Sequence, residues 1–270
     1  MSVSAQLVKE LREKTGVGIM DCKKALEQSN GDFDKAITYL REKGMATATK
    51  KSDRSTNEGR VFAALSADHT QGVLLELNCE TDFVSGNEAF LGLGTSLAAH
   101  ILNHSIATLE SLQASTIEGQ SFEAYLSESV LKLGEKISVK LLTFIHTKGS
   151  IGTYTHMNGK IGVLVEFNVP VSEEVGKDIA MHIAASAPQY VQSSEVPESE
   201  IDKEKEIIKN QSLNEGKPEA VIEKIISGRI NKFFKDICLI DQAFVKNPDM
   251  TVKQVLAGAS VVRFCRYMLG

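Results

Sequence analysis

GVLLELN at residues 72–78 returns as GVLVEFN at residues 162–168, and this repeated phrase decides the fold. After each copy a helical pattern follows, with the matching segments AAHI at residues 98–101 and AMHI at residues 180–183. From the asparagine that ends the phrase to the histidine of the helical pattern there are 22 positions in the first copy (Asn78 to His100) and 14 in the second (Asn168 to His182). The first copy therefore holds about eight extra residues, which we place within CETDFVSGN at residues 79–87. An insertion in one copy of a duplicated scaffold is where a functional site is expected.

The composition is that of an ordinary globular protein, with 42% hydrophobic and 24% charged residues among 270. A net charge of −5 provides no overall cationic field, so direct binding to nucleic acid is disfavoured, and only a local basic patch stays open. The four cysteines, at positions 22, 79, 238 and 265, form neither a CxxC pair nor a disulfide framework. We find no signal peptide and no run of about 18 apolar residues. We therefore expect a cytoplasmic protein with no membrane partner.

Three short helical patterns occupy residues 1–44. The first ends at TGVG, residues 15–18, and the second covers about residues 19–28. The third begins after Gly31, with Asp32 as a good N-cap. The patterns predict a compact three-helix bundle, which resembles the ubiquitin-associated type of domain. Residues 45–58 are small and polar without periodicity, so we expect a linker there.

Each copy of the repeated phrase belongs to a predicted β-hairpin. The first hairpin pairs residues 60–65 with 72–78, and the second pairs 151–155 with 161–169 around Asn158-Gly159, a strong turn signal. A helical pattern follows each hairpin, at residues 90–103 and 175–185. The predicted fold class is therefore α+β, with a duplicated core of small antiparallel sheets that carry helices. We assign residues 59–147 to the first core subdomain, and residues 148–190 and 231–270 to the second.

The segment 191–230 interrupts the second subdomain. Charged residues crowd between positions 195 and 206, and GKP at 216–218 precedes an apolar series that ends at Ile226. We expect a coiled-coil-like helical hairpin that protrudes from the body. A solvated helix pair and a docking arm are equally supported by the pattern. As a docking arm, the hairpin would form a homodimer or a 2:2 complex, or bind another partner.

No catalytic, nucleotide-binding or metal-binding motif is found. His100 and His104 have the i, i+4 spacing of metal ligands, but no third candidate ligand follows at a spacing typical of a metal-binding motif. His182 takes the matching place in the second copy, which indicates an architectural role for this position. Glycine-rich phosphate loops are absent, and an isolated cysteine at a strand end, such as Cys79, is more often structural than catalytic. The sequence predicts no catalytic residue, no cofactor and no metal.

The extra segment contains TDFV at residues 81–84. In one interpretation, Asp82 caps the next helix and Phe83 packs on the core. In the other, Phe83 is held at a loop tip beside an anion and enters a pocket of a partner. The duplication favours the second interpretation, because the sister copy builds strand and helix without the segment. Burial of the phenyl group would contribute about 1.5–3 kcal/mol to such a complex.

Two long stretches resemble signatures of the bacterial elongation factor Ts family: LREKTGVGIMDCKKAL at residues 11–26 and ELNCETDFV at residues 76–84. The likeness extends through YTHMNGKIGV at 154–163, DIAMHIAA at 178–185 and QAFVK at 242–246, and so covers almost the whole chain. The resemblance implies a translation elongation factor without catalytic chemistry. Its role would be guanine-nucleotide exchange on elongation factor Tu, so that GDP leaves and GTP rebinds.

The resemblance also implies which residues contact elongation factor Tu: Thr81, Asp82, Phe83, Val84, Arg12, Ile19, Met20 and His156. In the family the phenylalanine wedges between two helices of the nucleotide domain, and the aspartate helps disturb the Mg²⁺ and phosphate region. The bundle residues pack on a helix of the same domain, and the histidine meets another domain. Many relatives have methionine where Ile19 stands, and the contact stays apolar. Several relatives continue into a further C-terminal helix, so we expect that contact to be absent or shortened here.

Two other functions compete with this interpretation. An adaptor that binds ubiquitin-like folds would depend on residues 1–44 alone and would leave Asp82 and Phe83 unexplained. A thiol or metal enzyme would use Cys79 with His100 or His156, but their spacing gives this no support.

Overall fold

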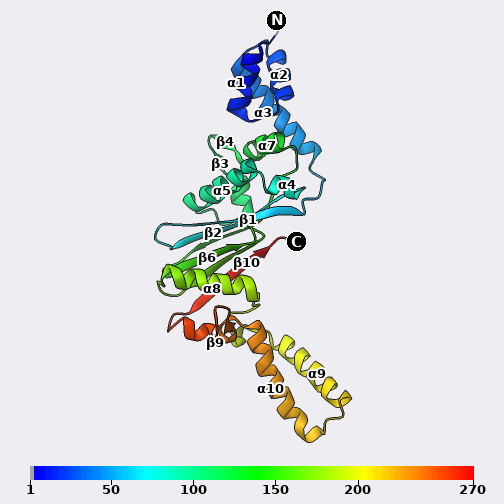
Figure 1. Cartoon of the computed structure of the whole chain (residues 1–270), viewed down its shortest axis with the longest axis vertical. Coiled ribbons are helices and arrows are strands. Elements are labelled where there is room, and N and C mark those ends of the chain that lie inside the picture. The colour runs from blue at the N-terminus through cyan, green and yellow to red at the C-terminus, as the bar shows by residue number, and fades with distance from the viewer. Residues whose placement is uncertain (1–2) are drawn as a thin grey trace.

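The computed structural model, which describes residues 3–270, is an elongated α+β molecule (Figure 1). A helical bundle lies at one end, two small antiparallel sheets with their helices form the middle, and a helical hairpin protrudes at the other end. The predicted fold class is confirmed. Across this described part of the chain, no helix combines the length and the apolar character needed to cross a bilayer.

The N-terminal bundle consists of α1 (Ala5–Thr15), α2 (Ile19–Gln28) and α3 (Phe33–Lys50). Asp32 caps α3 as predicted, because its carboxylate accepts a hydrogen bond of 3.0 Å from the Lys35 amide. The bundle has its own core of buried side chains: Val8, Leu11, Val17, Cys22, Ala25, Leu26, Ala36 and Leu40. The three predicted helices are confirmed.

Helix α3 continues to Lys50, so the prediction of a linker was wrong for residues 45–50. The physical reason is packing against α7 (Phe122–Leu133). Gly44 is buried there, and a Cβ atom on it would lie 3.0 Å from the carbonyl oxygen of Ser127. Such close contact stabilises a helical turn whose own sequence carries no amphipathic pattern.

The duplication is present in the topology of the two sheets. In the first repeat the hairpin β1–β2 is followed by α5, and β5 then pairs with β2. In the second, the hairpin β6–β7 is followed by α8, and β10 then pairs with β7. The bounds are Glu58–Leu65 (β1), Gln71–Cys79 (β2), Glu88–Asn103 (α5), Ser138–His146 (β5), Ser150–His156 (β6), Ile161–Phe167 (β7), Glu173–Ser186 (α8) and Val261–Met268 (β10). Both predicted hairpins and both helices are confirmed, whereas β5 and β10 were not predicted.

The repeated phrase forms the two central strands, β2 and β7, which are buried along nearly their whole length. Residues at odd positions of the two strands face the helix layers, and Leu74 and Leu164 face the opposite sheet. The two sheets therefore pack face to face, with helices on the outside of both, as Figure 1 shows.

One glycine in each copy of the phrase allows the sheets to approach each other. A Cβ atom on Gly162 would overlap the side chain of Val61 and would lie 3.0 Å from Leu74 Cδ1. At the equivalent Gly72, a Cβ atom would lie 3.0 Å from Ile151 Cγ2. Larger residues at these positions would push the sheets apart.

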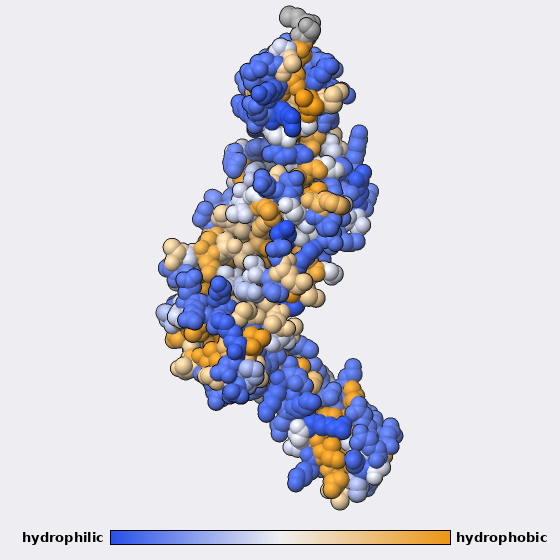
Figure 2. Space-filling view, viewed as in Figure 1, coloured by the Kyte–Doolittle hydropathy of each residue, from blue (hydrophilic) through white to orange (hydrophobic). Residues whose placement is uncertain are grey.

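The remaining elements are insertions into the two repeats. Those of the first are α4 (Asp82–Ser85), α6 (Leu109–Gln113), β3 (Thr116–Ile117), β4 (Gln120–Ser121) and α7. Those of the second are a 3₁₀ turn (Ser193–Glu195), α9 (Glu198–Asn214), α10 (Glu219–Ile237), a 3₁₀ turn (Leu239–Asp241), β8 (Ala243–Phe244), β9 (Asn247–Thr251) and α11 (Val252–Val255). Helices α9 and α10 are the protruding hairpin, with an apolar stripe on its surface (Figure 2). The predicted helical arm is confirmed.

The histidine of the second repeat is an internal support. His182 is fully buried, its Nε2 lies 2.8 Å from Gln242 Oε1, and its Nδ1 accepts a hydrogen bond of 3.2 Å from the Val245 amide. Gln242 Nε2 donates to the Asp236 carbonyl at 2.7 Å, which fixes the orientation of the amide. His182 is therefore neutral with its proton on Nε2, and burial lowers its pKa. The architectural role predicted for this position is confirmed for His182.

Replacing Gly162→Ala should lower the free energy of unfolding by about 1–3 kcal/mol, because the new methyl group overlaps Val61 across the sheet interface. Gly72→Ala should cost less, since its nearest neighbour, Ile151 Cγ2, would lie 3.0 Å from the new Cβ, whereas Val61 Cγ1 would lie only 2.4 Å from a Cβ on Gly162. Urea unfolding measures both. The control is Gly92→Ala in α5, where a Cβ atom would meet nothing within 4 Å. It should stabilise the helix by about 0.5–1 kcal/mol, and equal losses in all three variants would contradict the interpretation.

The stability of the protein should fall between pH 7 and pH 5 partly because of His182. Its folded pKa is lowered, so its contribution is present above the unfolded pKa and is lost as the pH falls. The variant His182→Gln has no titrating group at this position. Its free energy of unfolding should therefore change less steeply with pH, by at most about 1.4 kcal/mol per pH unit. Urea unfolding of both proteins across this range checks the slope. Parallel pH profiles would show that His182 does not contribute.

Candidate partner-binding site

The extra segment of the first repeat folds into a single helical turn, α4, between β2 and α5. Thr81 is its N-cap, and its hydroxyl oxygen accepts a hydrogen bond of 3.4 Å from the Val84 amide. Asn87 caps α5 in the same way through the Ala89 amide, at 2.8 Å. The interpretation in which Asp82 caps the following helix is therefore wrong, because Thr81 and Asn87 serve as caps and Asp82 lies exposed on the first turn.

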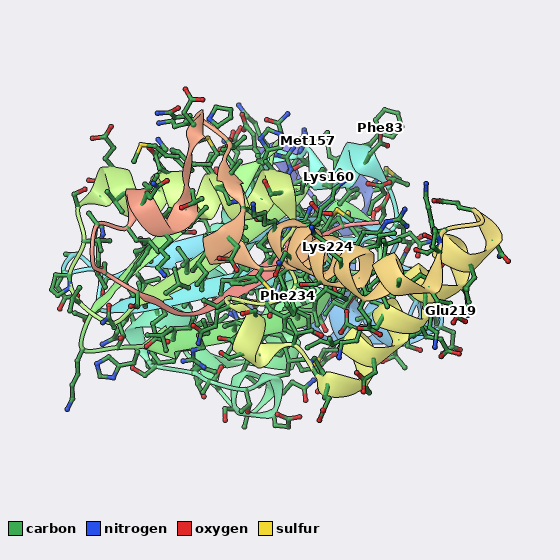
Figure 3. All side chains as sticks on the ribbon, turned by 90° about the horizontal axis from the view of Figure 1, so that it is seen from below. Phe83, Met157, Lys160, Glu219, Lys224 and Phe234 are labelled. Atoms are coloured by element: carbon green, nitrogen blue, oxygen red, sulfur yellow. The ribbon has the colours of Figure 1, made fainter. Side chains whose placement is uncertain are left out.

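Phe83 is 87% exposed, more than any other large apolar side chain of residues 3–270. Its neighbours anchor the turn instead: Val84 packs against the first core, and Ser85 is buried. In Figure 3 the ring of Phe83 extends outward from α4 at the edge of the molecule. The interpretation in which Phe83 packs on the core is wrong, because this short helix directs its side chain to solvent.

The turn is held from both ends by residues distant in sequence. On the incoming side, the Glu135 carboxylate accepts hydrogen bonds from the amides of Glu80 (3.0 Å) and Thr81 (2.9 Å) and from the Thr81 hydroxyl (2.6 Å). On the outgoing side, Arg60 Nε donates to the Ser85 carbonyl at 2.8 Å. Phe83 thus projects from a fixed turn and not from a free loop.

Arg60 contacts α4 through Ser85 and also contacts the turn between β6 and β7. The Val61 amide donates to the Gly159 carbonyl at 2.7 Å, which docks this turn on β1 beside Arg60. The turn has four residues, with φ angles of 51°, 54° and 84° at Met157, Asn158 and Gly159. Met157 is 63% exposed, and Figure 3 places it at the same edge of the molecule as Phe83. Sequence reasoning missed Met157; its position between His156 and Asn158-Gly159 was the available signal.

His156, the predicted residue of this hairpin, is exposed at the end of β6. Its Nδ1 lies 3.1 Å from the Tyr154 hydroxyl oxygen, and the two rings stack with centroids 5.9 Å apart. Tyr154 thereby orients the imidazole on the surface.

The other predicted residues remain on the bundle. Ile19 and Met20 open α2 and are 53% and 70% exposed, and Arg12 is exposed in the last turn of α1. Figure 1 places this bundle at the end of the molecule, whereas α4 lies beside the first sheet. The structure therefore gathers residues 81–84 in one turn close to the β6–β7 turn and keeps the bundle residues on a second, separate surface.

The thiol at Cys79 is not a reactive group. It is fully buried, and burial raises its pKa to about 12, so it stays protonated at neutral pH. Its sulfur donates a hydrogen bond to the Thr81 carbonyl at 3.1 Å, which adds to the support of the turn. His100 lies 3.1 Å from the Ser115 hydroxyl. Within residues 3–270, no three His, Cys, Asp or Glu side chains are grouped as metal ligands.

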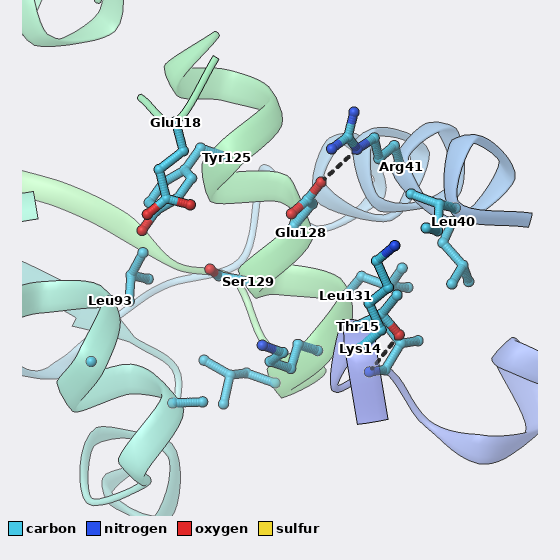
Figure 4. Close-up of a pocket in the computed structure, with 16 residues that line it drawn as sticks. Lys14, Thr15, Leu40, Arg41, Leu93, Glu118, Tyr125, Glu128, Ser129 and Leu131 are labelled. Atoms are coloured by element: carbon cyan, nitrogen blue, oxygen red, sulfur yellow. Dashed lines mark hydrogen bonds and ion pairs between the residues drawn. The ribbon is translucent and has the colours of Figure 1, made fainter. Parts of the chain in front are cut away.

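A cavity of about 610 Å³ lies beside the contact between α3 and α7 and is lined by residues of the bundle, α5 and α7 (Figure 4). Arg41 of the bundle and Glu128 of α7 are among the lining residues, and they form an ion pair at 3.0 Å. This hollow marks the joint between the bundle and the core.

The fold and the site define a protein that presents exposed apolar side chains on fixed turns, as proteins that bind other proteins do. The family model for elongation factor TS matches residues 80–270. The chain therefore belongs to the elongation factor Ts family, whose members are translation elongation factors with elongation factor Tu as partner. The matched range includes residues 81–84 and His156, while Arg12, Ile19 and Met20 precede it.

Phe83→Ala should change the free energy of unfolding by no more than about 0.5 kcal/mol, because the ring has almost no contact with the rest of the protein. Phe90→Ala, at a fully buried phenylalanine of α5, should cost about 3–5 kcal/mol. Urea unfolding of the two variants makes the comparison. If Phe83→Ala lowers the free energy of unfolding by more than about 1 kcal/mol, the ring supports the fold.

Proposed function

We propose that this protein is a guanine-nucleotide exchange factor that binds the GDP form of elongation factor Tu and promotes release of GDP, so that GTP can rebind. The observation that carries the proposal is Phe83, 87% exposed on a turn whose two ends are fixed. An exposed phenyl ring held in this way is suited to enter a pocket that opens in the nucleotide domain of the GTPase.

The energetics follow from the exposure of the ring. Burial of Phe83 in a partner would contribute about 1.5–3 kcal/mol. Because α4 is already ordered in the free protein, little of this is lost to ordering the turn on binding. The contribution is realised only in the conformation of the GTPase that accepts the ring, so binding shifts the population toward that conformation.

The charge beside the ring supports the same function. Asp82 is exposed next to Phe83. When Phe83 enters the nucleotide domain, this carboxylate comes with it and disturbs the Mg²⁺ and phosphate region. Exchange factor and nucleotide then bind the GTPase with opposing preference, and this coupling is reciprocal and typically about 1–3 kcal/mol. Excess GTP sets the direction of exchange, and the factor itself is not an enzyme.

The remaining contacts would add affinity and orientation. Arg12, Ile19 and Met20 would pack on a helix of the nucleotide domain, and His156 would meet a second domain, with Met157 beside it. Such contacts require no cofactor, and the protein would act in the cytoplasm. Self-association through the α9–α10 arm, as a homodimer or a 2:2 complex, stays a prediction.

The test is the rate of release of labelled GDP from elongation factor Tu with and without this protein. The wild-type protein should accelerate release strongly, and Phe83→Ala should lower the acceleration about ten- to a hundredfold, the equivalent of the lost burial. Val262→Ala, at an exposed valine of β10, should leave it unchanged. Unchanged release in the presence of the wild-type protein would refute the proposal.

A further inference from the structure

Three segments far apart in sequence meet behind the turn that carries Phe83. They are residues 51–54, which follow α3, residues 80–81, which precede α4, and residues 134–136, which follow α7. Hydrogen bonds connect each segment to the other two. We call this meeting point the junction.

Glu135 is the centre of the junction. Its carboxylate accepts from the amides of Glu80 and Thr81 and from the Thr81 hydroxyl, the last at 2.6 Å. The same hydroxyl oxygen accepts the Val84 amide as the N-cap of α4. Because the Thr81 hydroxyl donates its hydrogen bond to Glu135, the lone pairs of the hydroxyl oxygen are directed toward the amide of Val84, in the helix that Thr81 caps. Glu135 therefore determines both the path of the chain into α4 and the orientation of its cap.

The junction also holds the segment that leads from the bundle. The Glu80 carboxylate accepts from the Lys136 amide at 2.7 Å, a bond that lowers its pKa, and it pairs with Arg54 at 3.1 Å. Lys136 Nζ donates to the carbonyls of Ser52 (2.6 Å) and Arg54 (2.8 Å). Lys51 Nζ donates to the carbonyl of Gly134 at 2.6 Å. The chain that follows α3 is thus fixed to the residues that hold the Phe83 turn.

Helix α7 connects the junction to the bundle itself. Gly44 of α3 packs against the Ser127 backbone, and Arg41 pairs with Glu128 at 3.0 Å, as Figure 4 shows. Helix α7 and the residues after it therefore contact both the α3 helix of the bundle and the turn that carries Phe83.

We propose that Glu135 is a positioning residue for nucleotide exchange. Glu135 fixes the direction in which Phe83 projects from the core. It also fixes the position of this turn relative to the bundle, so that the Phe83 turn and the bundle surface reach elongation factor Tu together. This role rests on the proposed exchange function. Misplacement of a wedge by about 1 Å weakens its action strongly even when all of its atoms are present.

The two substitutions that test Glu135 differ in their effect on the hydrogen bonds. Glu135→Ala removes all three acceptors. Glu135→Gln keeps an oxygen that accepts the two amides, and its NH₂ group donates to the Thr81 hydroxyl, which still accepts the Val84 amide. The matched control is Glu123→Ala, at an exposed carboxylate in the first turn of α7.

The first measurement needs no partner. Amide hydrogen exchange in the free protein, read by NMR, should be faster at Glu80 and Thr81 by about tenfold or more in Glu135→Ala, with the amides of β2 and α5 unaffected. GDP release from elongation factor Tu should be accelerated about tenfold less by Glu135→Ala than by the wild-type protein. Glu135→Gln should stay within about threefold of the wild type, and Glu123→Ala should equal it.

A double variant separates positioning from general damage. In the Phe83→Ala background, Glu135→Ala should cause little further loss, because it acts through the ring. An equal loss in both backgrounds, or loosened amides with unchanged GDP release, would overturn the positioning role. Those results differ from failure of the exchange function, in which the wild-type protein itself leaves GDP release unchanged.

Discussion

The close packing of two sheets through Gly72 and Gly162 is the constraint on which the rest of the structure depends. Each glycine occupies the same place in its copy of the repeated phrase, and each faces the opposite sheet. At Gly162 the opposite sheet is so close that there is no room for a methyl group. This contact makes β2 and β7 the centre of one four-layered body. The helices on the outside and the inserted segments are all placed relative to that centre.

The two repeats differ in what each adds to the common scaffold, and the turn that we propose for nucleotide exchange is one of these additions. The first repeat adds α4 with Phe83 after its second strand, and α7 with Glu135 before its third. The second repeat adds the α9–α10 arm and places its histidine under QAFVK at residues 242–246. Because hydrogen bonds from Glu135 and Arg60 hold both ends of the turn, a single exposed ring can be kept at a defined position without a core of its own around it.

The sequence predicted those features whose causes are local or repeated. The hairpins followed from the repeated phrase and the turns beside it, and the exposure of Phe83 followed from comparing one copy with the other. Strands β5 and β10 were missed because they pair with β2 and β7 after long insertions and no turn signal announces them. The extension of α3 depends on contact between Gly44 and Ser127, and Glu135 binds Thr81 across 54 positions, so neither is visible in a local pattern. The roles proposed for Arg12, Ile19 and Met20 rest on family resemblance alone.

We propose that Phe83 couples binding of this protein to the loss of nucleotide from elongation factor Tu. The most direct measurement is the affinity of the protein for nucleotide-free and for GDP-bound elongation factor Tu, in the wild type and in Phe83→Ala. We expect the wild type to bind the nucleotide-free form about tenfold tighter or more, and the ratio of the two affinities to shrink in the variant. If Phe83→Ala weakens both complexes by the same factor and leaves the ratio unchanged, the ring is only a binding contact and the claim is wrong.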